Sequence, residues 1–126
     1  MEQRDKLDVI FEMQNKFDTE LMERRNLQDI DAATWIQKET LAMISELGEL
    51  IDEVNFKWWK NPKPIDENAV KSELVDVLHF FVSMCLKMGM TADELHDMYL
   101  EKNKENFNRQ DGLSKKAGYA VSDLKE

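Results

Sequence analysis

The heptapeptide SELGELI at residues 45–51 returns as SELVDVL at residues 72–78, and this repeat is the strongest structural signal in the sequence. Both copies read Ser-Glu-Leu, then any residue, an acid and two aliphatic residues. At about 100° per residue, an α-helix carries the two acids of each copy on one face, at the edge of an apolar stripe. The repeat therefore predicts two successive helices with matched acidic edges.

Four helices are predicted in all, and no segment alternates as a strand does. They cover residues near 3–25, 32–60, 67–89 and 92–107. Asp31 is expected to cap the second helix, and the NPKP segment at 61–64 to end it, because proline cannot continue a helix. Gly89 is expected to end the third helix. Thr91 and Glu94 form a capping-box pattern that opens the fourth.

The length of 126 residues predicts one domain, and the low content of four Gly and two Pro favours long helices. The predicted fold class is all-α, with a four-helix, bundle-like arrangement. We expect a helical catalytic domain at residues 1–110 and a polar tail at 111–126 that becomes ordered on ligand binding. A core of this size leaves apolar surface that a second copy of the chain would cover.

The formal net charge of −9 disfavours nucleic-acid binding, which needs basic surface, but it is compatible with a phosphorylated small molecule held through a metal. The single cysteine, Cys85, is expected to be a small core residue. The N-terminus lacks a signal-peptide pattern, and no apolar run is long enough to span a membrane. A cytoplasmic protein without membrane contact is the resulting expectation.

The four acids of the repeat are Glu46, Glu49, Glu73 and Asp76. They converge if the two helices pack antiparallel through their apolar stripes. Four like charges repel one another, and burial adds to the cost, so a counter-ion is needed. Mg²⁺ is the expected ion because it prefers carboxylate and water oxygens. The alternative is a solvated acidic surface that happens to repeat.

Several neighbouring residues fit a nucleotide pocket, and each also has a purely structural interpretation. One of Trp58 and Trp59 could stack on a base, although a core or dimer contact is the favoured interpretation of the pair. His79 is expected near the acids, where a hydrogen-bonded structural role is the alternative. Phe81 lies on the apolar stripe, and Gln14 offers an amide near the core or at a partly exposed helix position.

A small basic group follows near the C-terminus. Lys102, Asn106 and Arg109 are spaced so that they share one helical face, and Tyr119 lies in the tail. Two cations with an amide fit a phosphate clamp. The alternative is a solvated helix end.

With these residues identified, the chain resembles the dimeric, all-α dUTPase family within the MazG-like nucleoside triphosphate pyrophosphatase superfamily. Four segments carry the resemblance: EMQ at 12–14, SELGELIDEVNFKWWK at 45–60, SELVDVLHFF at 72–81 and KNKENFNRQ at 102–110. The chain departs from the family at Asp18, where some members carry Asn. It also departs in the residues DGLSKKA, which intervene before Gly118 and Tyr119.

The resemblance implies a Mg²⁺-dependent homodimer that hydrolyses dUTP to dUMP and pyrophosphate. Whether dUDP is a second substrate stays open from the sequence. Glu46 or Glu49 is expected to position and deprotonate the attacking water molecule. The metal ligands that the resemblance implies are Glu46, Glu49, Glu73 and Asp76. The substrate-binding residues that it implies are Gln14, Trp59, His79, Phe81, Lys102, Asn106, Arg109 and Tyr119.

Two other functions remain open from the sequence. One is a MazG-like pyrophosphatase for another nucleotide, such as dCTP or a damaged dNTP. The other is a helical interaction protein without enzymatic activity, whose Met and Trp side chains form a dimer face.

Overall fold

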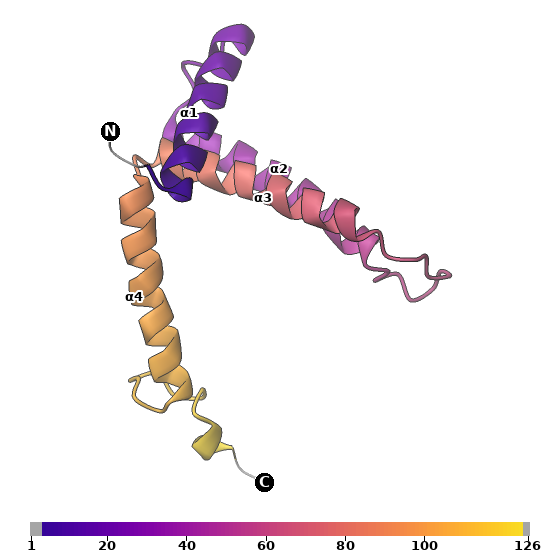
Figure 1. Ribbon diagram of the computed structural model, residues 1–126, viewed down its shortest axis with the longest axis vertical. Coiled ribbons are helices and arrows are strands. Elements are labelled where there is room, and N and C mark those ends of the chain that lie inside the picture. Colours follow the sequence, from indigo (N-terminus) through magenta and orange to yellow (C-terminus); the bar gives the residue numbers. More distant parts are fainter. Residues whose placement is uncertain (1–3, 125–126) are drawn as a thin grey trace. The chain divides into compact units, whose positions relative to one another are not determined.

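The computed structural model describes residues 4–124, and this part of the chain is helical and contains no strand. Its elements are α1 (Lys6–Arg25), α2 (Ala32–Glu53), α3 (Glu67–Lys87), α4 (Ala92–Gln110) and the short 3-10 helix η1 (Val121–Asp123) (Figure 1). The predicted all-α class with four α-helices is confirmed. The predicted starts of the second, third and fourth helices, at residues 32, 67 and 92, agree with the structure. Gln3, at the predicted start of the first helix, lies outside the described residues.

The helices fall into two compact units. The first unit, Met1–Thr91, carries α1, α2 and α3, and the second, Ala92–Glu126, carries α4 and η1. Within the first unit, α2 and α3 lie side by side as an antiparallel pair, and α1 packs against α3 (Figure 1). The division expected at residues 110 and 111, between a catalytic domain and a tail, stays a prediction.

The helix ends follow local side-chain chemistry. Asp31 accepts a hydrogen bond from the backbone N–H of Thr34 at 2.7 Å, which confirms it as the N-cap of α2. This bond also holds the pKa of Asp31 below its usual value. At the end of α3, Gly89 takes the left-handed conformation (φ 75°), and the N–H of Met90 donates to the Cys85 carbonyl. Gly89 therefore ends α3 as predicted.

The predicted extension of the second helix to residue 60 is wrong, because α2 ends at Glu53. Asn55 adopts a left-handed conformation (φ 60°) that breaks the helix. Its side-chain amide donates to the Lys63 carbonyl at 2.8 Å and accepts from the Lys63 N–H at 2.9 Å. These two hydrogen bonds between Asn55 and Lys63 close a loop, and we call them the Asn55 clamp. Trp58 and Trp59 lie in that loop and not on a helical stripe.

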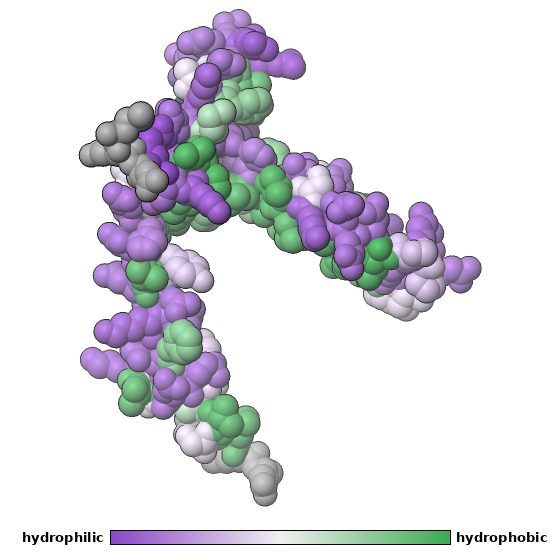
Figure 2. Space-filling model, viewed as in Figure 1, coloured by the Kyte–Doolittle hydropathy of each residue, from purple (hydrophilic) through white to green (hydrophobic). Residues whose placement is uncertain are grey.

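The core of the first unit is small. Phe11, Trp35, Val82 and Cys85 are its buried apolar residues, so the prediction of Cys85 as a core residue is confirmed. Apolar side chains also gather on the surface of α1 and of the α2–α3 pair (Figure 2). Those more than half exposed on these helices are Met13, Phe17, Leu41, Ile44, Leu74 and Val75. Contiguous apolar surface is typical of association, and the homodimer stays a prediction.

Within the described residues, no single helix has both the length and the apolar composition to cross a membrane. When α3 and α4 are taken together as one segment, they meet this criterion by length and composition alone. That is weak evidence for a membrane-spanning segment.

Candidate metal centre and nucleotide pocket

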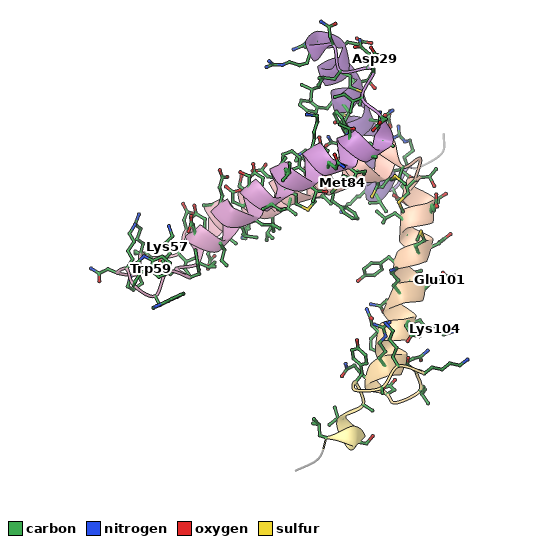
Figure 3. The ribbon with its side chains drawn as sticks, turned by 180° about the vertical axis from the view of Figure 1, so that it is seen from behind. Asp29, Lys57, Trp59, Met84, Glu101 and Lys104 are labelled. Atoms are coloured by element: carbon green, nitrogen blue, oxygen red, sulfur yellow. The ribbon has the colours of Figure 1, made fainter. Side chains whose placement is uncertain are left out.

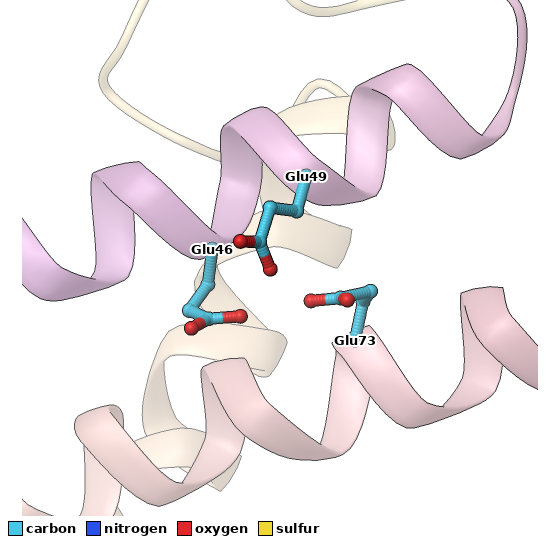
Figure 4. A group of neighbouring side chains, drawn as sticks. All are labelled: Glu46, Glu49 and Glu73. Carbon is cyan, nitrogen blue, oxygen red and sulfur yellow. The ribbon is translucent and has the colours of Figure 1, made fainter.

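Three carboxylates from two helices meet in the middle of the α2–α3 pair. Glu46 and Glu49, one turn apart on α2, face Glu73 on α3 (Figure 4). One oxygen from each of the three side chains lies within 4.8 Å of the others. The sequence repeat produces this arrangement, because each copy places its acids at the inner edge of its helix and the helices run antiparallel.

The negative charge of the carboxylate cluster is not balanced by neighbouring groups in the described part of the chain. Oε2 of Glu46 and Oε2 of Glu73 are both buried, and no group in the described part of the chain donates a hydrogen bond to either oxygen. The pKa of Glu46 is raised, first by a hydrogen bond shared with the Glu73 carboxyl group, then by burial and by the negative charges of Glu73 and Asp76. Such a site needs a proton or a cation. Its hard oxygen donors fit Mg²⁺, which such carboxylates would hold together with water.

Asp76, the fourth predicted ligand, lies one turn after Glu73 and lines the neighbouring cavity. Its charge acts on Glu46. Its oxygens are not part of the tight group that the three glutamates form among the described residues. The assignment of Asp76 as a metal ligand therefore stays a prediction.

A cavity of about 880 Å³ opens beside the carboxylates, between α1, α2 and α3. Its walls are mostly apolar, with Val9, Ile10, Met13 and Phe17 of α1 on one side. The polar residues that line it are Gln14, Asp18, Glu39, Glu46, Asp76 and His79. A largely apolar cavity with a few convergent polar groups is typical of a small-molecule site.

Gln14 and His79, two predicted substrate residues, are brought together in this cavity. Oε1 of Gln14 lies 2.7 Å from Nδ1 of His79, and Nε2 of Gln14 donates to Oδ1 of Asp18 at 2.9 Å. Gln14 and Asp18 are both buried, at 7% exposure each. The amide therefore has a partner at each end, as a buried amide requires.

Asp18 is also the end point of a second set of hydrogen bonds. The hydroxyl group of Ser83, on α3, donates to Oδ2 of Asp18 at 2.8 Å. Nε1 of Trp35, on α2, donates in turn to Oγ of Ser83 at 3.1 Å. We call these five residues the buried relay, which consists of the buried Trp35, Ser83, Asp18 and Gln14 and ends at the exposed His79. It ties α1, α2 and α3 together at the cavity wall, which Gln14, Asp18 and His79 line.

Glu39 of α2 lines the same cavity close to Asp18. Burial raises the pKa of Glu39 to about 7, and the negative charge of Asp18 adds to the effect. Near neutral pH this carboxyl group is therefore partly protonated and can donate as well as accept hydrogen bonds.

Trp59 and Phe81 lie apart from these polar groups. Trp59 is 62% exposed in the loop after α2, where it contacts Trp58 edge-to-face at 4.7 Å between ring centroids. Lys57 lies beside it at the end of the helix pair (Figure 3). Phe81 is 39% exposed on α3, and its neighbour Phe80 lines the cavity instead. The base-binding roles of Trp59 and Phe81 stay predictions.

The second unit brings together two of its four predicted substrate residues. The Arg109 guanidinium lies over the Tyr119 ring at 5.2 Å from the centroid. Nε of Arg109 also donates to Glu105 at 3.2 Å, and the Ser114 hydroxyl group donates to the same carboxylate at 2.5 Å. These bonds, Ser114 first, hold the pKa of Glu105 below its usual value. Lys102 and Asn106 are exposed on α4.

A protein-family model described as dUTPase matches residues 6–91. The chain belongs to the dUTPase family. This confirms the resemblance identified from the sequence. The match covers α1, α2 and α3, and so it includes the whole carboxylate cluster, the cavity and the buried relay.

Two curated relatives are phage enzymes. The dCTP pyrophosphatase of Enterobacteria phage LZ5 is 36% identical over 75 residues, covering 60% of this chain and 44% of the relative. The dCTP pyrophosphatase of Enterobacteria phage T4 is 34% identical over 88 residues, covering 59% of this chain and 52% of the relative. The chain thus spans about half the length of these relatives. No solved structure matches it.

Three polar residues of this dUTPase-family chain were not identified as site residues from the sequence: Glu39, Ser83 and Trp35. A spacing signal was present for two of them. Glu39 lies seven residues before Glu46, and Ser83 lies seven residues after Asp76. Seven residues are two helical turns, so each shares a face with a predicted ligand. Trp35 carries no such signal, because its partner lies on another helix.

Proposed function

We propose that this chain is a Mg²⁺-dependent pyrophosphohydrolase that converts a pyrimidine deoxynucleoside triphosphate to the monophosphate and pyrophosphate. The observation that carries the proposal is the pair of buried, donor-less oxygens of Glu46 and Glu73 beside the cavity. Membership of the dUTPase family and the two phage dCTP pyrophosphatases support a nucleotide pyrophosphatase. A helical interaction protein gains nothing from carboxylates that repel one another at its centre.

In this proposal Glu46, Glu49, Glu73 and Asp76 hold the cation, which when bound neutralises phosphate oxygens and aligns the triphosphate for in-line attack. The carboxylate of Glu46 or Glu49 orients a water molecule and accepts its proton. The water oxygen bonds to the α-phosphorus, the bond from that phosphorus to the bridging oxygen breaks, and pyrophosphate leaves with the bonding electrons.

The base end of the nucleotide is assigned to Gln14 and His79, which line the cavity together. Trp59 and Phe81 are proposed to contact the base or the sugar. In the second unit, Lys102, Asn106, Arg109 and Tyr119 are proposed to bind phosphate oxygens, and the contact between Arg109 and Tyr119 supports their acting as a group.

dUTP is the first candidate substrate, because the resemblance implies it and the matching family model is described as dUTPase. dCTP is the second candidate, and the names of both phage relatives favour it. We propose a homodimer as the active form, which would cover apolar surface on α1 and the α2–α3 pair.

The test is turnover of dUTP, dCTP, dTTP, dATP and dGTP with Mg²⁺, with release of pyrophosphate as the readout. The proposal expects a pyrimidine nucleotide to be hydrolysed fastest and expects no release without a divalent cation. Equal rates on all five nucleotides would remove the pyrimidine assignment. No pyrophosphate from any of them would remove the enzymatic one.

A charge-matched pair of variants tests the metal ligands. Glu49→Gln is expected to lower kcat/KM at least about 100-fold, because removing a ligand should cost no less than disturbing one. Glu101→Gln, on α4, removes the same charge from an exposed position (Figure 3) and should leave kcat/KM within about twofold. A fully active Glu49→Gln protein would contradict the assignment.

A further inference from the structure

The hydrogen bonds of the buried relay converge on Asp18 from both ends. A carboxylate can only accept, so Ser83 and Gln14 must both donate to Asp18. Gln14 then has its Nε2 toward Asp18 and its Oε1 toward His79. Because Oε1 also only accepts, Nδ1 of His79 must carry the proton and donate. The orientation of the Gln14 amide is thus set by the position of a negative charge behind it.

The fixed orientation matters because the two pyrimidines present opposite patterns. Uracil offers an acceptor at O4 and a donor at N3, whereas cytosine offers a donor at N4 and an acceptor at N3. Gln14 has one N–H and one lone pair left after its two relay bonds, and it lines the cavity. An amide that can rotate by 180° matches either base in turn, but an amide held in one orientation matches only one of them.

We infer that Asp18, Ser83 and Trp35 are positioning residues that lock the Gln14 amide and thereby determine which pyrimidine nucleotide is accepted. This inference rests on the proposed function. Asp18 acts through Gln14 in this assignment, and it is not itself required to touch the base.

The chemistry of the relay makes the lock effective. Rotation of the amide would turn Oε1 toward the Asp18 carboxylate and the amide N–H groups toward the protonated Nδ1 of His79, so both bonds would be lost. His79 is exposed, but Gln14, Asp18 and Ser83 are buried at 7%, 7% and 2% exposure, so water is poorly placed to replace the bond between Gln14 and Asp18. Loss of buried bonds of this kind corresponds to a discrimination of about tenfold or more.

The first experiment compares the ratio of kcat/KM for dUTP to kcat/KM for dCTP in three proteins. The natural chain should favour one nucleotide by about tenfold or more. Asp18→Leu, which keeps a similar side-chain shape without an acceptor, should move the ratio at least about tenfold toward unity, mainly through KM. Glu20→Gln removes a charge from the exposed side of α1 and should leave the ratio unchanged.

Two results of this comparison would overturn the inference. One is a natural protein that hydrolyses dUTP and dCTP equally well, because a locked amide cannot serve both. The other is a folded, active Asp18→Leu protein whose ratio equals that of the natural chain. Ser83→Ala removes one of the two donors to Asp18 and should shift the ratio in the same direction by a smaller factor.

The second experiment needs neither turnover nor a variant. Nitrogen-15 NMR of the natural protein at pH 8.5, where an imidazole is normally neutral, reports which ring nitrogen of His79 is protonated. The relay expects the proton on Nδ1 and none on Nε2, and the reverse pattern would overturn the lock. If no nucleotide is hydrolysed, the proposed function fails, while the NMR result still decides the orientation of Gln14.

Discussion

The carboxyl groups of Glu46 on α2 and Glu73 on α3 face each other across the helix pair, and Oε2 of each is buried without a hydrogen-bond donor in the described chain. Their proximity raises the pKa of Glu46. A folded protein that binds more protons than its unfolded chain loses stability as pH rises. The unliganded protein is therefore expected to lose stability as the pH rises from the ordinary pKa of a glutamate to the raised pKa of Glu46.

Replacing Glu73 with Gln should raise the thermal midpoint of the metal-free protein at pH 8, because an amide can donate to Glu46 and removes one like charge. The same change should abolish the increase in midpoint that Mg²⁺ gives the natural chain, since binding to the folded state is the source of that increase. Thermal scans with and without Mg²⁺ measure both effects. A Glu73→Gln protein still stabilised by Mg²⁺ would argue against the cluster as the metal site.

Glu39 gives a second pH-dependent prediction. Its pKa rises from 4.5 to about 7 on folding, so the folded state is penalised increasingly as pH rises from about 4.5 to about 7, and by a constant amount above that. Glu39→Gln should therefore be more stable than the natural chain at pH 8. We expect a gain of about 1 kcal/mol, after allowing for solvent screening of a partly exposed group. Urea unfolding at pH 4.5 and pH 8 should show the gain only at the higher pH.

Arg109 is expected to act on the phosphates, since its guanidinium is held by Glu105 and Tyr119 in a fixed position. Arg109→Ala should lower kcat/KM by about 100-fold, the effect typical of losing one stabilising donor at a reacting centre. Lys104→Ala is the matched control, because Lys104 is an exposed cation of the same helix (Figure 3). Equal losses in the two variants would indicate a general charge effect and contradict a specific contact.

The apolar surface of α2 yields a prediction about assembly. Sedimentation of the natural chain should give about twice the mass of 14.8 kDa. Ile44, 58% exposed on α2, is expected to lie in the dimer contact, so Ile44→Glu should give monomers. Leu113→Glu places the same charge at a position that is 76% exposed in the second unit and should leave the dimer intact. A monomeric natural chain would refute the expectation.

The carboxylate cluster could be predicted from the sequence because it depends on local periodicity. Glu46 and Glu49 are one turn apart, and the repeat places Glu73 in the matching frame of the next helix. Beyond this periodicity, the prediction needed only the assumption that the two adjacent helices pack antiparallel. Helix starts were predicted for the same reason, since a capping residue such as Asp31 acts within its own turn.

The end of α2 and the buried relay could not be predicted in this way. Proline marks where a helix must have ended, but the Asn55 clamp ends α2 earlier through bonds to Lys63, eight residues away in sequence. The relay joins Trp35, Ser83 and Asp18 from three helices. Such bonds depend on how the helices pack, which no local pattern specifies.

The Asn55 clamp has an optical consequence. Trp58 and Trp59 are 85% and 62% exposed on the short loop that it closes. Trp35, the remaining tryptophan of the three, is only 3% exposed and lies in the core of the first unit. The protein therefore carries two kinds of fluorophore. Quenching by a soluble agent such as iodide should reach the loop pair and spare the interior one, so emission from this small enzyme candidate can report separately on events at the loop and on melting of the core.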